Sequence, residues 1–305
     1  MRVVVAGSSG LIGTALCRAL DSRGHVVIRL VRRRSSGPSE LSWEPRTGQI
    51  DEGALEGVDA LVNLAGAGIG DRRWSAGRRR LLVSSRIDST SLLARTLASL
   101  EPPPRVLVNA SAVGIYGNRG DEVLDEHSEP GDGFLAGLCR QWEASVSVAA
   151  QAGIRTVLVR SGVVLSASGG ALARQLPLFR LGLGGRLGNG SQWLSWISLE
   201  DEVRVLLRAI DDDGLSGPVN SVAPQPVTNR QFTTALGRAL QRPAVLAVPP
   251  PALRLVLGRG LVDDVLLASQ RVRPAALQAV AHGFAHGDLD TALAALLNKR
   301  AATLT

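Results

Sequence analysis

The stretch "MRVVVAGSSGLIG" (residues 1–13) decides the fold of this chain. Residues 2–7 form an apolar run, which is typical of a strand buried on both faces of a parallel sheet. Helical spacing follows over residues 11–24 and ends at Gly24, a residue type that commonly terminates helices. The chain therefore begins with a strand, a tight turn and a helix.

Three glycines in this turn form a G-x-x-G-x-x-G pattern, and each has a physical task. One permits the tight turn, one lets a pyrophosphate approach the backbone, and one lets the helix pack closely on the strand. The free N–H groups at the start of the helix then hold the phosphate. The pattern predicts dinucleotide binding through the loop residues Gly7, Ser9, Gly10, Leu11, Ile12 and Gly13.

The chain continues with alternating strands and helices up to about residue 165. We expect strands at 25–32, 59–66 and 104–112, a strand with its exit loop at 154–165, and helices at about 74–100 and 134–153. This alternation predicts an α/β protein whose Rossmann domain, residues 1–165, is a doubly wound parallel sheet.

The pattern changes beyond residue 165 and becomes rich in turns. Short helical segments at 199–212, 229–241, 251–258 and 289–298 predict a smaller C-terminal lobe, residues 166–305, for a substrate or a partner. We expect this lobe to return to the sheet at least once. The glycine-rich stretch at 181–193 is compatible with a loop that wraps a ligand and with a hairpin with tight turns.

The end of the second predicted strand indicates which dinucleotide is bound. Sites that prefer NAD place an acidic residue there, against the ribose 2′-hydroxyl. Here the strand ends in Arg32, Arg33 and Arg34, with no carboxylate beside them in the sequence. An arginine can pair with a 2′-phosphate, so we expect NADP(H) and take Arg32 as the first candidate. The alternative is that these arginines only solvate a loop.

Composition excludes several other classes. The formal charge of +7 comes from arginines, since Lys299 is the one lysine of the chain. No basic segment is interleaved with aromatic residues, so we expect an arginine-rich surface and no nucleic-acid partner. The two cysteines form neither a disulfide framework nor a metal set. No signal peptide and no apolar run of about 18 residues is recognisable, so we expect a cytoplasmic protein without a membrane segment.

The motifs "GSSGLIG", "VNLAGAGIGDRRW", "SSRIDST", "SAVGIYG" and "RSGVVLSASGGAL" resemble the extended short-chain dehydrogenase/reductase superfamily. More closely, they resemble an atypical group called epimerase family proteins, similar to nucleoside-diphosphate-sugar epimerases. The resemblance covers nearly the whole chain and implies a Rossmann fold and NADP binding, but no known substrate. It adds cofactor contacts from Leu64, Ala65, Gly66, Arg86 and Val164.

The same resemblance exposes a departure. The Tyr-x-x-x-Lys pair of the superfamily, in which a phenol exchanges a proton with the substrate, aligns with Leu135 and Cys139. Ser111 is the nearest match to the active-site serine, although a register shift would place Ala112 there. Tyr116 is the single tyrosine and lies where relatives have a turn. Ser111 and Tyr116 are therefore the candidate catalytic residues.

Other groups remain as possible proton donors. Glu143 and Asp201 are two of these, and we expect Glu143 to lie on a helix surface or against the lobe. Ser198 stands where the resembled group commonly has a histidine, which suggests that this chain has lost that side chain. Two functions remain open: an oxidoreductase or epimerase-like enzyme acting on an unidentified small molecule, and a non-catalytic NADP(H)-binding sensor or scaffold protein.

Overall fold

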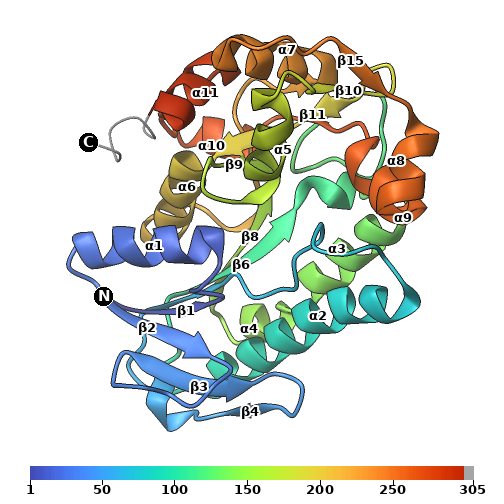
Figure 1. The fold of residues 1–305 in the computed structure, drawn as a ribbon. Helices are drawn as coiled ribbons and strands as arrows, with labels where there is room; N and C mark the ends of the chain where they lie inside the picture. Colours follow the sequence, from blue (N-terminus) through green and yellow to red (C-terminus); the bar gives the residue numbers. More distant parts are fainter. Residues whose placement is uncertain (299–305) are drawn as a thin grey trace.

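The computed structural model describes residues 1–298, so Lys299 and the end of the predicted lobe lie outside the described residues. Its centre is an eight-stranded sheet with the order β13-β8-β6-β5-β1-β2-β3-β4 (Figure 1). The strands span Arg2–Ala6 (β1), Val26–Val31 (β2), Glu40–Glu44 (β3), Gln49–Ile50 (β4), Ala60–Asn63 (β5), Val106–Ala112 (β6), Arg155–Ser161 (β8) and Gly217–Ser221 (β13). Neighbours are parallel except β3 and β4, so the predicted doubly wound sheet is confirmed.

The strand order reverses at β1, and this reversal positions the site. Val4 of β1 is in register with Ile28 of β2 on one side and with Leu61 of β5 on the other. The connections from β1 to β2 and from β5 to β6 therefore run in opposite directions across the sheet. A crevice opens at the carboxyl ends of the strands at such a reversal, and ligands of this fold class bind there.

Helices cover both faces of the sheet because successive residues of β1 point to opposite sides. Val3 and Val5 pack with α1 (Leu11–Ser22) and α6 (Leu199–Asp211). Val4 and Ala6 pack on the other face, with α2 (Ala76–Ala98) and α4 (Ser147–Gln151). Figure 1 shows α1 and α6 on one side of the strands and α2, α3 and α4 on the other.

Two elements differ from the sequence prediction. The helix expected at 134–153 is split into α3 (Phe134–Ala144) and α4, because the chain turns at Ser145. In the segment predicted as a strand with its exit loop, 154–165, the strand ends at Ser161, and the exit segment forms β9 (Val163–Leu165), which pairs with β12 (Trp196–Ser198) of the lobe. Gly162 lies at this change of direction, where a Cβ would come within 2.7 Å of the Ser195 carbonyl oxygen.

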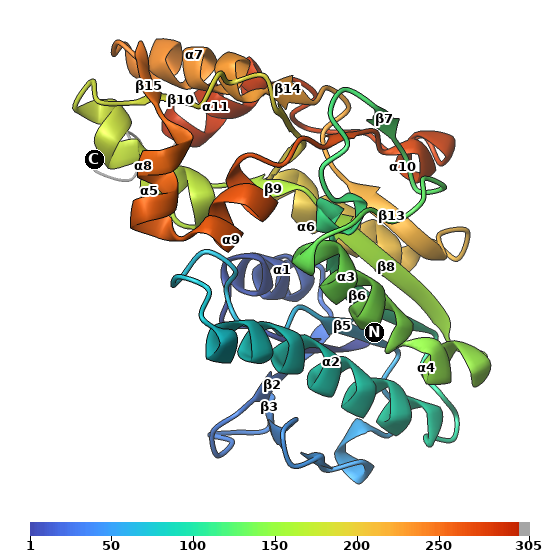
Figure 2. The ribbon, with the colours of Figure 1, turned by 90° about the vertical axis from the view of Figure 1, so that its right-hand side faces the viewer.

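The second half of the chain forms a lobe above the crevice (Figure 2). Trp196, Phe232 and Leu293 belong to its own apolar core. The chain returns to the main sheet through α6 and β13, so the lobe and the sheet interleave. The predicted lobe helices correspond to α6, α7 (Asn229–Leu240), α8 (Pro250–Leu257) and α11 (Leu289–Asn298). The lobe also contains α5 (Gly170–Arg180), β10 (Gly185–Leu187), β11 (Trp193–Leu194), β14 (Val227–Thr228), β15 (Leu246–Val248), α9 (Arg259–Leu261), the π-helix η3 (Val262–Leu266), β16 (Arg271–Val272) and α10 (Ala275–Ala279).

Short elements complete the chain: the 3-10 helices η1 (Gly53–Leu55) and η2 (Val113–Tyr116), and β7 (Val123–Leu124), which pairs with β16. Among the helices of residues 1–298, none is both long enough and apolar enough to cross a membrane.

Candidate functional site

The glycine loop between β1 and α1 has the tight turn and the close helix packing that the glycine pattern predicts. Gly7 has a φ of 76°, and a Cβ there would lie 2.6 Å from the Leu64 carbonyl oxygen. A Cβ on Gly13 would overlap the Gly7 carbonyl oxygen, so this glycine lets α1 approach the loop. Gly10 is different: it is exposed, precedes the first residue of α1, and a Cβ there would meet only the Gly7 oxygen, at 3.3 Å. Gly10 therefore keeps the outer surface of the loop open.

The end of β5 lies against this loop. The Leu64 N–H donates to the Ala6 carbonyl, and the Ala65 N–H donates to the Asn63 side chain. Gly66 lies beside Arg86, whose Cζ would be 3.1 Å from a Cβ at this position. The predicted cofactor contacts Leu64, Ala65 and Gly66 therefore line one edge of the crevice together with Arg86, which comes from a separate segment.

The end of β2 carries the expected arginines and one acid that the sequence prediction missed. Arg32 is exposed and has no hydrogen-bond or ion-pair partner among residues 1–298. Arg33 pairs with Glu40 at 2.5 Å, across the loop of residues 34–39 that leads from β2 to β3. Hydrogen bonds from Arg33 and Ser36 lower the pKa of Glu40 to about 2. Glu40 is thus a carboxylate near the strand end, but Arg33 already balances its charge.

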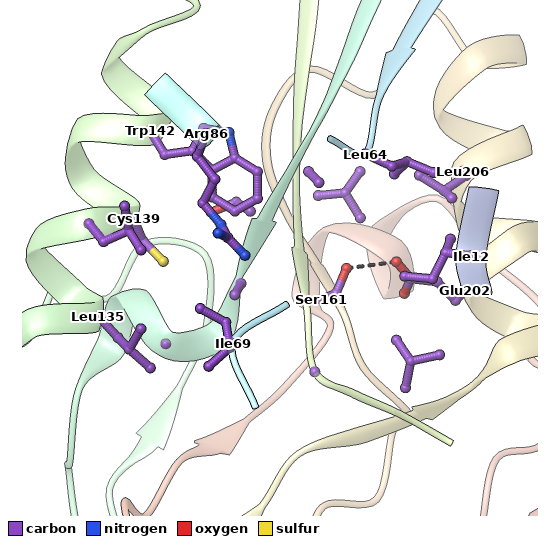
Figure 3. A pocket seen from close by; sticks show the side chains of 18 residues that line it. Ile12, Leu64, Ile69, Arg86, Leu135, Cys139, Trp142, Ser161, Glu202 and Leu206 are labelled. Atoms are coloured by element: carbon purple, nitrogen blue, oxygen red, sulfur yellow. Dashed lines mark hydrogen bonds between the residues drawn. The ribbon is translucent and has the colours of Figure 1, made fainter. Parts of the chain in front are cut away.

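A cavity of about 340 Å³ lies at the carboxyl ends of β6 and β8, between α3 on one side and α1 and α6 on the other (Figure 3). Most of its wall is apolar, as in ligand pockets generally. Four side chains bring polar groups to it: Arg86, Ser111, Ser161 and Glu202. The other lining residues are Ile12, Leu64, Ile69, Ala110, Ala112, Gly114, Leu135, Leu138, Cys139, Trp142, Val159, Gly162, Val164 and Leu206.

Arg86 enters this cavity as a buried cation. Its Nη1 donates to the carbonyl oxygens of Ala67 and Leu82, both at 3.1 Å, and its guanidinium lies 5.0 Å from the ring centroid of Trp142. Burial lowers the pKa of Arg86 to about 10, so the side chain is still charged at neutral pH. Since carbonyl dipoles and a ring hold it instead of a carboxylate of the described chain, its charge remains available to an anion.

The positions that align with the tyrosine and lysine both face the cavity. Leu135 and Cys139 lie one turn apart on α3, on the wall that also contains Trp142 (Figure 3). Burial raises the pKa of the Cys139 thiol to about 12. Neither side chain therefore exchanges a proton near neutral pH, and both contribute packing to the cavity wall.

Of the two candidate catalytic residues, the structure places one in the cavity. Ser111, the last residue but one of β6, lies on the cavity wall and donates a 2.6 Å hydrogen bond to Glu143. Tyr116 is fully buried and is not among the lining residues; its hydroxyl donates to Asn220 at 2.7 Å and accepts from Arg160 at 3.0 Å. Burial raises the pKa of Tyr116.

The expectation that Glu143 lies on the helix surface or against the lobe is wrong. Its side chain is 11% exposed and forms an ion pair with Arg160, at 2.9 Å through each of two hydrogen bonds. The cause is the β6–β8 pairing, which sets Ser111 opposite Arg160. Glu143 on α3 reaches both residues from above the sheet.

Asp201, predicted as a possible proton donor near the site, is not among the lining residues of the cavity, but its neighbour Glu202 is. Asp201 accepts hydrogen bonds from the backbone N–H groups of Ala285 and His286. Glu202 is held by the hydroxyls of Ser161 and Ser221, each at 2.6 Å, and burial raises its pKa. The sequence could have predicted that Glu202 faces the same side as Leu206, because residues four apart share a helix face.

A histidine from the C-terminal segment lies beside Ser198. His286 Nδ1 lies 3.0 Å from the Ser198 hydroxyl and 3.6 Å from a carboxylate oxygen of Asp201. Ser198 is fully buried, so this cluster supports the junction of α6 with the C-terminal segment.

A second, more open cavity of about 760 Å³ lies between the lobe and the loop that contains Asn118, Gly120 and Asp121. The glycine-rich stretch forms part of its wall, with Leu187, Gly188, Asn189, Ser191 and Gln192, and part of it forms β10. Within residues 1–298, no cluster of three or more His, Cys, Asp or Glu side chains has the arrangement of a metal site.

Comparison with known proteins places these features in a family. The model of the NAD dependent epimerase/dehydratase family matches residues 3–222, and a domain of unknown function, DUF1731, matches residues 248–296. An epimerase family protein of Mycobacterium leprae is 48% identical over 95% of this chain and 94% of its own length. The human epimerase family protein SDR39U1 is 36% identical over 96% of this chain and 98% of its own.

The solved structures give the same result. The crystal structure of human SDR39U1 with NADPH superposes with a TM-score of 0.89 at 36% identity and covers 97% of this chain and 99% of that one. A complex of MoeE5 with UDP-glucuronic acid and NAD superposes with a TM-score of 0.79 at 19% identity, covers 99% of this chain and 100% of that one, and shows a shared fold.

Proposed function

Because the chain belongs to the NAD dependent epimerase/dehydratase family, we propose that it binds NADP(H) across the crevice and is an oxidoreductase for a small molecule. The observation that carries this proposal is the continuity of the glycine loop, the β5 end and the 340 Å³ cavity along the carboxyl edge of one sheet. Similarity to SDR39U1, crystallised with NADPH, supports the same cofactor.

The residues present suit the phosphate and ribose groups of NADP(H) at three places. The start of α1 would hold the diphosphate, since the first N–H groups of a helix have no partner within it. Exposed Arg32 would pair with the 2′-phosphate, and buried Arg86 would face the anionic or ribose part of the cofactor. Ile12 and Val164 would border the nicotinamide, which supplies hydride chemistry when bound.

A second function, an NADP(H)-binding sensor or scaffold, is favoured by one observation. Leu135 and Cys139 present no proton-exchanging group to the cavity at neutral pH. The polar groups Ser111, Ser161 and Glu202 in the same cavity favour the oxidoreductase, because a purely binding surface does not require them there.

The test is a titration with NADPH followed by its fluorescence, on the natural protein and on Gly10→Val. Gly10 is exposed, so a branched side chain there should fill the diphosphate space while the protein stays folded. Gly283→Val is the matched control, because nothing lies within 4 Å of that position. A folded Gly10→Val protein with unchanged affinity would show that the loop holds no phosphate.

A further inference from the structure

Fifteen consecutive residues of the lobe, 243–257 ("PAVLAVPPPALRLVL"), are apolar except for Arg254, yet none of them is buried. The segment contains β15 and α8. On α8, Leu255 and Val256 are 77% and 67% exposed. A helix that buries no side chain adds little to the core of the lobe, and a large exposed apolar surface marks a site of interaction.

The end of α5 extends this apolar surface. The strand β10 follows α5 and pairs with β15, and Gly182 lies beside Pro243. Figure 2 shows α5, β15 and α8 along one side of the lobe. With Leu255 and Val256, five further side chains that are each about half exposed or more form what we call the apolar face: Leu178, Leu181, Leu183, Val245 and Leu246.

The two stretches of chain that form this face have a charge of one sign. No Asp or Glu occurs at 144–199 or at 214–262, whereas these stretches contain ten arginines. The nearby carboxylate of Asp263, just after the second stretch, is already paired with Arg254 at 2.8 Å. The surroundings of the apolar face are therefore cationic.

Three exposed arginines lie in the elements of the face or next to them. Arg180 is the last residue of α5, and Arg242 directly precedes the apolar segment. The Arg242 Nε donates to the Arg180 carbonyl oxygen at 3.0 Å, so these two residues lie together. Arg259 follows α8 by two residues. The apolar face thus has arginines at both ends, where they are free to meet an anionic surface.

We propose that the apolar face attaches the protein to the surface of a membrane that contains anionic phospholipids. Apolar side chains enter the boundary between headgroups and acyl chains, and the arginines meet the lipid phosphates. The helix α8 has 8 residues, whereas a spanning helix needs about 20, so it lies in the interface. A second copy of the chain in a two-fold contact would instead bring like charges together.

This inference goes beyond the proposed function, because no residue of the apolar face lies in the glycine loop or lines the 340 Å³ cavity. It is tested by sedimentation with vesicles of phosphatidylcholine alone and of phosphatidylcholine mixed with an equal amount of phosphatidylglycerol. The protein should sediment with the mixed vesicles and much less with the neutral ones. High salt should weaken the binding, because it screens exposed charges.

Two variants separate the apolar from the electrostatic contribution. Leu255→Gln with Val256→Gln should weaken binding to the mixed vesicles about tenfold or more, since two inserted side chains become polar. Arg180→Gln with Arg242→Gln should weaken it about 25-fold, because each arginine near an anionic surface contributes about fivefold. Both variants should bind NADPH like the natural protein, which also shows that they are folded.

Each variant has a matched control on the Rossmann domain. Val26→Gln with Val148→Gln changes two exposed apolar side chains, and Arg18→Gln with Arg95→Gln removes two exposed charges. Both controls should keep the affinity for the mixed vesicles. A loss in the controls as large as in the variants would show that the apolar face has no special role.

Three other results would overturn the inference. The first is no binding to either kind of vesicle, and the second is equal binding to both. The third is a dimer in light scattering without vesicles that Leu255→Gln with Val256→Gln dissociates, because a second copy would then cover the face. Vesicle binding by a protein that does not bind NADPH would support the inference and overturn only the proposed function.

Discussion

Glu202 and Ser161 are 41 residues apart in the chain, yet they are joined by a 2.6 Å hydrogen bond at the cavity wall. Ser221 holds the second carboxyl oxygen at the same distance, and the side chain has almost no contact with water. A carboxyl group so enclosed favours its neutral form, as the raised pKa of Glu202 reflects.

Glu202→Gln should therefore change the pH dependence of stability. The folded pKa of Glu202 lies above its unfolded value, so its contribution is complete below about pH 4.5 and is lost as the pH rises through the folded pKa. Glutamine keeps the shape without ionising. The variant should gain on the natural protein by about 1.4 kcal/mol for each pH unit between the two pKa values. Urea unfolding at several pH values measures this; parallel curves for both proteins would contradict it.

Gly13→Ala should destabilise the fold. A Cβ there overlaps the Gly7 carbonyl oxygen, and the neighbouring atoms are backbone, which cannot turn aside as a flexible side chain does. Overpacking of this kind costs about 1–3 kcal/mol. Thermal and denaturant unfolding should show the loss, while Gly283→Ala, in open space, should unfold like the natural protein. An unchanged midpoint for Gly13→Ala would mean that α1 does not approach the loop as closely as described.

Arg32→Ala should reduce the preference for NADPH over NADH. A charge-assisted hydrogen bond to the 2′-phosphate contributes about 1.5–3 kcal/mol, which corresponds to roughly 10- to 150-fold in affinity. The exposed Arg18 on α1 offers a control, since Arg18→Ala removes the same charge elsewhere. Calorimetric titration with both cofactors decides the matter. If Arg32→Ala keeps the preference for NADPH, another group must bind the 2′-phosphate. Equal affinities of the natural protein for NADPH and NADH would contradict the predicted preference itself.

The protein should show only trace turnover as an ordinary sugar-nucleotide epimerase. General acid–base catalysis supplies about 100- to 10,000-fold, and Leu135 and Cys139 supply none at neutral pH. A panel of UDP- and dTDP-sugars with NADP(H), followed by absorbance and product analysis, provides the measurement. Turnover on the order of 1 per second would refute this expectation.

The double substitution Leu135→Tyr with Cys139→Lys should not restore that activity. Cys139 is buried, so a lysine ammonium there would lose most of its hydration, and the guanidinium groups of Arg86 and Arg160 would repel it although Glu143 would attract it. The variant should lose thermal stability relative to Leu135→Tyr alone. An efficient epimerase as stable as the natural protein would show that the cavity still suits the chemistry of its relatives.

The sequence by itself determined the parallel sheet, the glycine loop and the lobe helices. Each rests on a local pattern: an apolar run such as residues 2–7, glycines three residues apart, or a helical repeat. Such patterns are dictated by backbone geometry and burial within a few residues, so they can be recognised without knowing which strands are neighbours.

Only the tertiary structure decided which polar groups meet. His286 beside Ser198, and Glu143 between Ser111 and Arg160, result from strand pairing or helix packing between distant segments, whereas Glu40 meets Arg33 across the short loop between β2 and β3. The surroundings of Glu202 were also set by the tertiary structure. A glutamate on a helix usually indicates a solvated surface, but Glu202 lines the cavity. A hydrogen bond acts over about 3 Å, so its partners are set by the arrangement of the whole sheet and not by spacing along the chain.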